Sequence, residues 1–181
     1  MCRYIIIGFL LLVFFSVQGQ NNWQSLEASD GLYRIALPDH YEQSTDTILR
    51  EFGTVMVFNF TAYELSDSIL YNFMDMHYPD RVDLSEDQVL ADSILQINLR
   101  EIANQLDGQV VYESELSIEH KGLQARIRTS SQRVVRIKMH ALHNRFLLQQ
   151  VHGLSETVNK TKAENFFKGL RLYPDNYRRD P

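Results

Sequence analysis

The sequence predicts an α+β fold, in which a mainly antiparallel β-sheet carries one long and one short helix packed on it. Most of the chain alternates apolar and polar residues in short segments between turn residues, which is typical of half-buried strands. Residues 86–106 instead repeat their apolar side chains every three or four positions, as an amphipathic helix does. A shorter helical repeat, with Ala163, Phe166, Phe167 and Leu170, follows near the C-terminus.

Residues 1–19 are predicted to be a cleavable export signal. Arg3 is followed by an apolar run over residues 4–15, and small or apolar residues at 17–19 offer a cleavage site. The run is short for a membrane span, which needs about 20 residues, so an uncleaved anchor is the less favoured alternative. Cys2 precedes the apolar run, whereas a lipid-modified cysteine would follow it. We therefore expect an exported protein, periplasmic or extracellular.

The rest of the chain is predicted to be a single globular domain over residues 20–172 with a loose tail over residues 173–181. Cys2 is the only cysteine and leaves with the signal, so stability must come from packing without an internal disulfide. The net charge of −5 becomes −6 without Arg3, which argues against a general nucleic-acid binder.

The first half is predicted to form strands. Turn residues at 29–31 separate the first two strands, Pro38 ends the second, and Gly53 marks a hairpin. The predicted strands cover residues 23–28, 32–37, 45–52, 54–65 and 69–78.

The long helix is predicted to begin after Ser85 as N-cap, with Gln88 three residues on, and to stop before Gly108. Its core-facing residues are Ala91, Ile94, Leu95, Leu99, Ile102 and Leu106.

The second half is predicted to form two hairpins. Residues 110–119 and 123–129 flank a two-residue turn at Lys121 and Gly122, which would place Glu115 opposite Arg128. Residues 134–142 and 146–151 flank His143 and Asn144.

Several segments, taken in their order along the chain, resemble segments of exported bacterial proteins. Residues 23–38 look like the opening of many uncharacterised exported bacterial proteins, and later segments follow in order: Gly53, residues 71–79, Gly108, Gly122, residues 144–146 and residues 165–172. Across most of residues 23–172 the order is similar to the PsbP/Mog1-like α/β/α sandwich group. The resemblance implies that fold and a binding or adaptor role, and it transfers no catalytic residues.

The metal candidates are Asp75, His77 and Asp80. Asp75 and His77 share one face of a strand, where they could hold a divalent metal or form a carboxylate-oriented imidazole. We favour a polar strand end that faces water, because the spacing fixes no third ligand. No metal and no cofactor are therefore expected.

The most organised polar feature is a basic face on two neighbouring strands, formed by Arg126, Arg128, Arg136, Lys138 and His140. These side chains could bind an anionic partner. The favoured alternative is that glutamates of the preceding strand neutralise them as cross-strand pairs: Glu113, Glu115 and Glu119.

Aromatic residues could line a pocket for an apolar ligand, although a core is the favoured interpretation. They are Phe58, Phe60, Tyr63, Tyr71, Phe73 and Tyr78.

The sequence favours an exported, non-catalytic domain that binds an envelope or extracellular protein. One alternative is a carrier of a small apolar or anionic ligand. Another is an envelope hydrolase that uses Asp75 and His77, although the chain has no Gly-x-Ser-x-Gly or phosphate-loop motif.

Overall fold

The computed structural model describes residues 23–50, 53–116 and 120–176. The predicted signal of residues 1–19 lies outside the described residues, as do Glu119 and the end of the predicted tail, residues 177–181.

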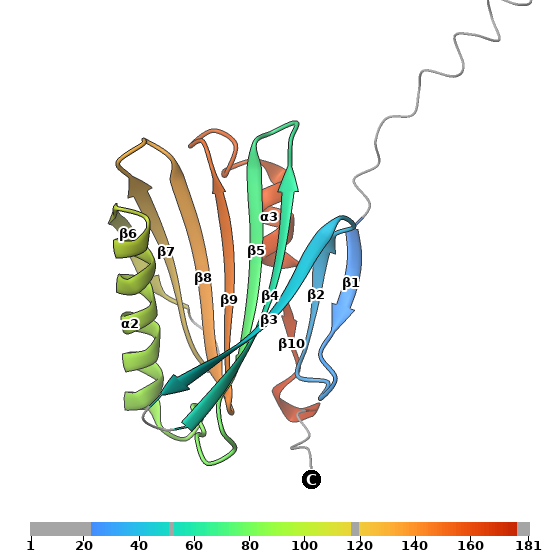
Figure 1. Ribbon diagram of the computed structural model, residues 1–181, viewed down its shortest axis with the longest axis vertical. Coiled ribbons are helices and arrows are strands. Elements are labelled where there is room, and N and C mark those ends of the chain that lie inside the picture. The colour runs from blue at the N-terminus through green and yellow to red at the C-terminus, as the bar shows by residue number, and fades with distance from the viewer. Residues whose placement is uncertain (1–22, 51–52, 117–119, 177–181) are drawn as a thin grey trace, which may run out of the picture.

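The centre of the molecule is a seven-stranded antiparallel sheet (Figure 1). Its strand order is β3-β4-β5-β9-β8-β7-β6. The strands are β3 (Tyr41–Arg50), β4 (Gly53–Glu64), β5 (Ile69–His77), β6 (Gly108–Glu115), β7 (Lys121–Thr129), β8 (Val134–Leu142) and β9 (Arg145–Gly153).

Each face of this sheet is covered by another layer (Figure 1). Helix α2 (Gln88–Gln105) lies on one face, over β6, β7 and β8. The other face carries α3 (Thr161–Lys168) and a small sheet of β1 (Trp23–Glu27), β2 (Tyr33–Pro38) and β10 (Arg171–Leu172). The predicted fold class, an α+β sandwich with one long and one short helix, is confirmed.

Two apolar cores result, one on each face of the sheet. Because side chains alternate along a strand, Val135, Ile137 and Met139 of β8 pack beneath α2, whereas Val134 and Leu142 point to the opposite layer. The second core includes Phe166 and Phe167 of α3, Leu32 just before β2, and side chains of β2 and β5, among them Ile35, Leu37, Ile69, Tyr71 and Phe73.

The helix α2 begins at a different cap from the one expected. Asp87 is its N-cap, and the carboxylate accepts a hydrogen bond from the Leu90 N–H at 2.9 Å. Ser85, the expected cap, accepts from the His143 N–H at 2.7 Å and so ties the helix entry to the β8–β9 turn. The predicted core stripe is confirmed, with Ile102 and Leu106 half-buried and Ala103 buried in addition.

The predicted β6–β7 register is wrong. Strand β6 ends at Glu115, which pairs with Leu123, and a bulge between Val110 and Tyr112 separates this stretch from the pair of Gln109 with Arg128. The connection between β6 and β7 is therefore longer than the predicted two-residue turn. The apolar alternation continues past Glu115 in the sequence, so the pattern alone could not show where the strand ends.

The start of the predicted loose tail is attached to the fold. The Tyr173 N–H donates to the Leu32 carbonyl at 2.7 Å, and His143 Nε2 lies 3.2 Å from the Pro174 carbonyl oxygen. A short 3₁₀ helix, Pro174–Asn176, follows.

The position of α2 predicts a contrast between two of its residues. Leu99→Ala removes a fully buried side chain and should lower the free energy of unfolding by about 2–5 kcal/mol. Val89→Ala, at a position that is 78% exposed, should change it by less than about 0.5 kcal/mol. Urea unfolding measures both, and equal losses would contradict this packing of α2.

Candidate functional site

Basic side chains of β7 and β8 line a cleft beneath α3. Arg126 pairs directly with Arg136 across the two strands, and Lys138 pairs with Gln124. With Glu164, Phe167 and Lys168 of α3 they line a cavity of about 230 Å³, which we call the basic cleft. The structure therefore brings together Arg126, Arg136 and Lys138 of the predicted basic face.

Arg136 connects the sheet to α3. Its Nη1 donates to Glu164 Oε1 at 2.5 Å and to the Val158 carbonyl at 2.9 Å. Its guanidinium carbon also lies 4.9 Å from the centre of the Phe167 ring, within the range of a cation–π contact. Arg136 thus positions α3 as well as contributing charge to the cleft.

The other cations of the cleft are less compensated. Arg126 Nη2 donates to the neutral amide oxygen of Asn159 at 3.0 Å. In the described part of the chain, neither Lys138 nor Lys168 forms an ion pair with a carboxylate. Lys138 is half-buried, and this burial lowers the pKa of its ammonium because the charged form loses hydration. The basic cleft therefore has an excess of positive charge that a bound anion would compensate.

Two members of the predicted basic face lie outside the cleft. Arg128 is exposed and pairs with Val134, one step beyond the lining residues. His140 is buried, and its Nδ1 lies 2.9 Å from His120 Nε2. Burial lowers the pKa of both imidazoles, that of His120 to about 4, so neither adds charge at neutral pH.

The expected neutralisation by glutamates of the preceding strand is wrong for Glu113 and Glu115, and Glu119 lies outside the described residues. Glu113 pairs with Ala125 and Glu115 with Leu123, and these partners face α2. Both glutamates therefore lie on the opposite side of the sheet from Arg126, and Glu113 accepts instead from Gln96 Nε2 of α2 at 2.5 Å. The register error exchanged the two faces for the part of β6 after the bulge, Tyr112 to Glu115.

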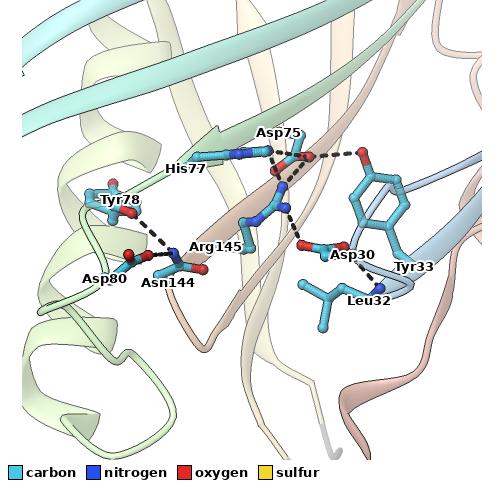
Figure 2. Close-up of polar contacts among 9 residues, drawn as sticks. All are labelled: Asp30, Leu32, Tyr33, Asp75, His77, Tyr78, Asp80, Asn144 and Arg145. Atoms are coloured by element: carbon cyan, nitrogen blue, oxygen red, sulfur yellow. Dashed lines mark hydrogen bonds and ion pairs between the residues drawn. The ribbon is translucent and has the colours of Figure 1, made fainter. Parts of the chain in front are cut away.

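A second group of charged side chains is buried where the β1–β2 turn meets the sheet (Figure 2). Arg145 of β9 is 5% exposed and donates from Nη1 to Asp75 Oδ2 at 2.7 Å and from Nη2 to Asp30. Asp75 Oδ2 also accepts from the Tyr33 hydroxyl at 2.8 Å and lies 2.9 Å from His77 Nε2. We call these five residues the Arg145 cluster.

The Arg145 cluster corrects one expectation and confirms another. Asp75 and His77 share a face of β5 as predicted, but Asp75 is 2% exposed and does not face water. Both contact the Arg145 guanidinium, which is a cation supplied by the chain itself. Asp80 lies apart, where its Oδ1 accepts from Asn144 Nδ2 at 3.2 Å (Figure 2).

Sequence reasoning missed the cation of this cluster. Arg145 lies directly opposite His77 in the β5–β9 pairing, and 70 positions separate it from Asp75 in the chain. Only the strand order brings them together, although a buried carboxylate does require a cationic or hydrogen-bonding partner. Burial and the neighbouring Asp75 carboxylate raise the pKa of Tyr33, which therefore stays a hydroxyl donor.

The candidate aromatic residues do not line one common pocket. Phe60, Tyr71 and Phe73 are buried in the core beneath the small sheet, while Tyr78 belongs to the core beneath α2. Tyr63 is 53% exposed. Phe58 packs against the His77 ring, with 4.6 Å between ring centres. Most of these rings are core residues, as the favoured interpretation had it.

The sandwich of α2, the seven-stranded sheet and the α3 layer defines a PsbP-like fold. It matches the solution structure of cyanobacterial PsbP from Synechocystis sp. PCC 6803, with a TM-score of 0.57 and 8% identity over 87% of this chain and 96% of that one. At this identity the likeness shows the fold alone. It confirms the PsbP-like part of the resemblance.

A protein of unknown function from Pseudomonas aeruginosa is more distant, with a TM-score of 0.41 and 12% identity over 79% of this chain and 90% of that one. No protein-family model matches the chain, and no curated protein matches it. Among the described residues, no helix has the length and apolar character needed to cross a membrane.

The Arg145 cluster predicts a large effect of removing its cation. Arg145→Ala leaves the Asp30 and Asp75 carboxylates buried without their cationic partner. It should therefore lower the free energy of unfolding by about 3–5 kcal/mol. Arg128→Ala removes an exposed arginine and should cost less than about 0.5 kcal/mol. Denaturant unfolding at neutral pH measures both, and a loss below about 1 kcal/mol for Arg145→Ala would show that the two buried carboxylates do not depend on Arg145 as their cation.

The buried histidines predict a loss of stability in acid. Burial lowers the pKa of His120 and of His152 from 6.5 to about 4, so between these values the unfolded chain binds protons that the folded chain does not. The free energy of unfolding should therefore fall as the pH drops from 6.5 to 4, by up to about 1.4 kcal/mol per pH unit for each histidine. Unfolding of His152→Gln should show a shallower slope. A slope that His152→Gln leaves unchanged would refute this assignment.

Proposed function

We propose that the chain is an exported binding domain, without catalysis, that holds a protein of the cell envelope or the extracellular space through an anionic group in the basic cleft. The observation that carries this proposal is the half-buried Lys138, which has no carboxylate partner among the described residues. A buried charge is costly unless it is paired, and an anion from a partner would provide the pair.

The surroundings of Lys138 support an anion over a neutral ligand. Arg126 and Lys168 line the same cavity without a carboxylate partner in the described residues, and Glu164 is the single acidic side chain in its lining. Glu164 is paired with Arg136, so the remaining cations are available to a ligand. Opposite charge at such a site also speeds the approach of the partner.

The rim of the basic cleft supports a protein as the source of this anion. Tyr112 of β6 lines the cavity and is 51% exposed, and Leu116 lies beside it in the lining. Exposed aromatic residues next to a charged site are typical of protein interfaces. An acidic segment of a partner could place a carboxylate in the cleft and an apolar side chain on this rim.

A carrier of a small anion is the second candidate, and the cleft volume of about 230 Å³ favours it because a small ligand would fit without a protein attached. The two candidates use the same cations, so the choice of probe has to separate them.

The test compares the wild-type chain with the double variant Arg126→Gln/Lys138→Gln. The probe is a hexaglutamate peptide, with binding measured by calorimetry at low salt. The affinity should fall at least about tenfold in the double variant, because charge-assisted hydrogen bonds are lost. Arg128→Gln is the matched control: it removes an exposed cation outside the cleft and should change the affinity less than about twofold.

Two outcomes would overturn parts of this proposal. Unchanged binding of hexaglutamate by a folded double variant would show that the basic cleft is not the site. Inorganic phosphate that binds as tightly as hexaglutamate, and loses affinity in the same variant, would replace the protein partner with a small anion.

A further inference from the structure

A second cavity lies beside the Arg145 cluster, on the same face of the sheet as the β1–β2 turn. Its volume is about 140 Å³, and its apolar walls include Leu26, Phe58 and Phe60. Tyr33, Asp75, His77 and Arg145 line it as well, and Glu27 of β1 adds an exposed carboxylate. A cavity of about 150 Å³ in another protein holds benzene, so this one has room for a group of similar size.

The two oxygens of the Asp75 carboxylate differ in their hydrogen bonds. Oδ2 accepts from the Tyr33 hydroxyl and from Arg145, and it lies within hydrogen-bonding distance of His77 Nε2. Oδ1 is buried and makes no hydrogen bond with any described residue. Buried carboxylate oxygens are rarely left without a donor, which an ordered water, an ion or a bound ligand supplies. Asp75 is among the residues that line the cavity.

The charges around the cavity favour a cationic donor. The Arg145 guanidinium is shared between Asp30 and Asp75, so the carboxylates of the cluster exceed its arginine by one. Glu27 adds a further negative charge. Phe58 and Phe60 line the same cavity and supply an apolar wall for the body of an amine.

We infer that this cavity binds the ammonium group of a small organic amine, with Asp75 Oδ1 as its acceptor and Phe58 and Phe60 against its apolar body. The ammonium could belong to a free amine or to a lysine side chain of another polypeptide. The inference concerns a different cavity from the basic cleft and does not depend on the proposed function.

The experiment is an NMR titration of the wild-type chain with benzylammonium and, separately, with Nα-acetyl-lysine amide. Saturable binding that shifts the signals of His77 and Phe58 is the expected result for at least one of the two amines, and the tighter one identifies the source. Benzyl alcohol, a neutral molecule of nearly the same size, should bind at least about tenfold more weakly than benzylammonium because the ionic hydrogen bond is lost.

Variants test the roles of the carboxylates. Asp75→Asn should abolish amine binding, but it also removes a partner of Arg145 and can unfold the chain. Glu27→Gln, at an exposed position, avoids this difficulty and should weaken benzylammonium by about twofold to fivefold while leaving benzyl alcohol unchanged. Glu42→Gln removes an exposed carboxylate of β3 outside the cavity lining and is the matched control.

Three results would overturn the inference. The first is no saturable binding of either amine by the folded wild-type chain. The second is equal affinity for benzylammonium and benzyl alcohol, which would reduce the site to an apolar cavity. The third is an equal loss of amine binding in Glu27→Gln and Glu42→Gln. This result would show that the affinity depends on the net charge of the protein and not on a carboxylate in the cavity.

Discussion

The pairing of Arg145 with two buried carboxylates is the interaction on which the arrangement of layers depends. Asp30 comes from the β1–β2 turn, Asp75 from β5 and Arg145 from the start of β9, so one guanidinium joins the small sheet to the centre of the large one. Apolar contacts are not directional, so two packed layers can shift relative to one another at little cost. A buried cation bonded to two carboxylates allows few relative positions of the segments that carry them. The cluster therefore fixes where the small sheet rests on the large one. We infer that its main effect is on this specificity of docking, because a buried ion pair is weak evidence for net stability.

The basic cleft depends on a comparable connection at the other end of this face. Arg136 donates hydrogen bonds to the Glu164 carboxylate and to the Val158 carbonyl. These bonds fix α3 above β7 and β8. The same arginine that forms part of the cleft floor thus also positions the wall that carries Lys168. Arg136 therefore both positions α3 and contributes charge, whereas Arg126 contacts only the Asn159 side chain before this helix.

Local patterns in the sequence were enough for the two helices, most of the strands and the fold class, but they missed β10 and the separate small sheet and failed where distant segments meet. The 3.6-residue repeat gave the buried face of α2 through Leu95 and Leu99, and alternation placed Arg126, Arg136 and Lys138 on one face. The β6–β7 register depended on a loop length that alternation does not encode, so Glu115 was paired wrongly. The role of Asp75 was hidden because Arg145 becomes its neighbour only through the β5–β9 pairing, which has no local signal.

The bulge in β6 has a consequence for how the molecule behaves at high concentration. Strand β6 is an outer edge of the seven-stranded sheet, where unpaired backbone groups could recruit a strand from another chain. The bulge between Val110 and Tyr112 interrupts the regular ladder beside this edge and increases its local twist. At the opposite edge, β3 carries exposed charged side chains such as Glu42 and Asp46. Both borders of the sheet thus have features that oppose edge-to-edge aggregation.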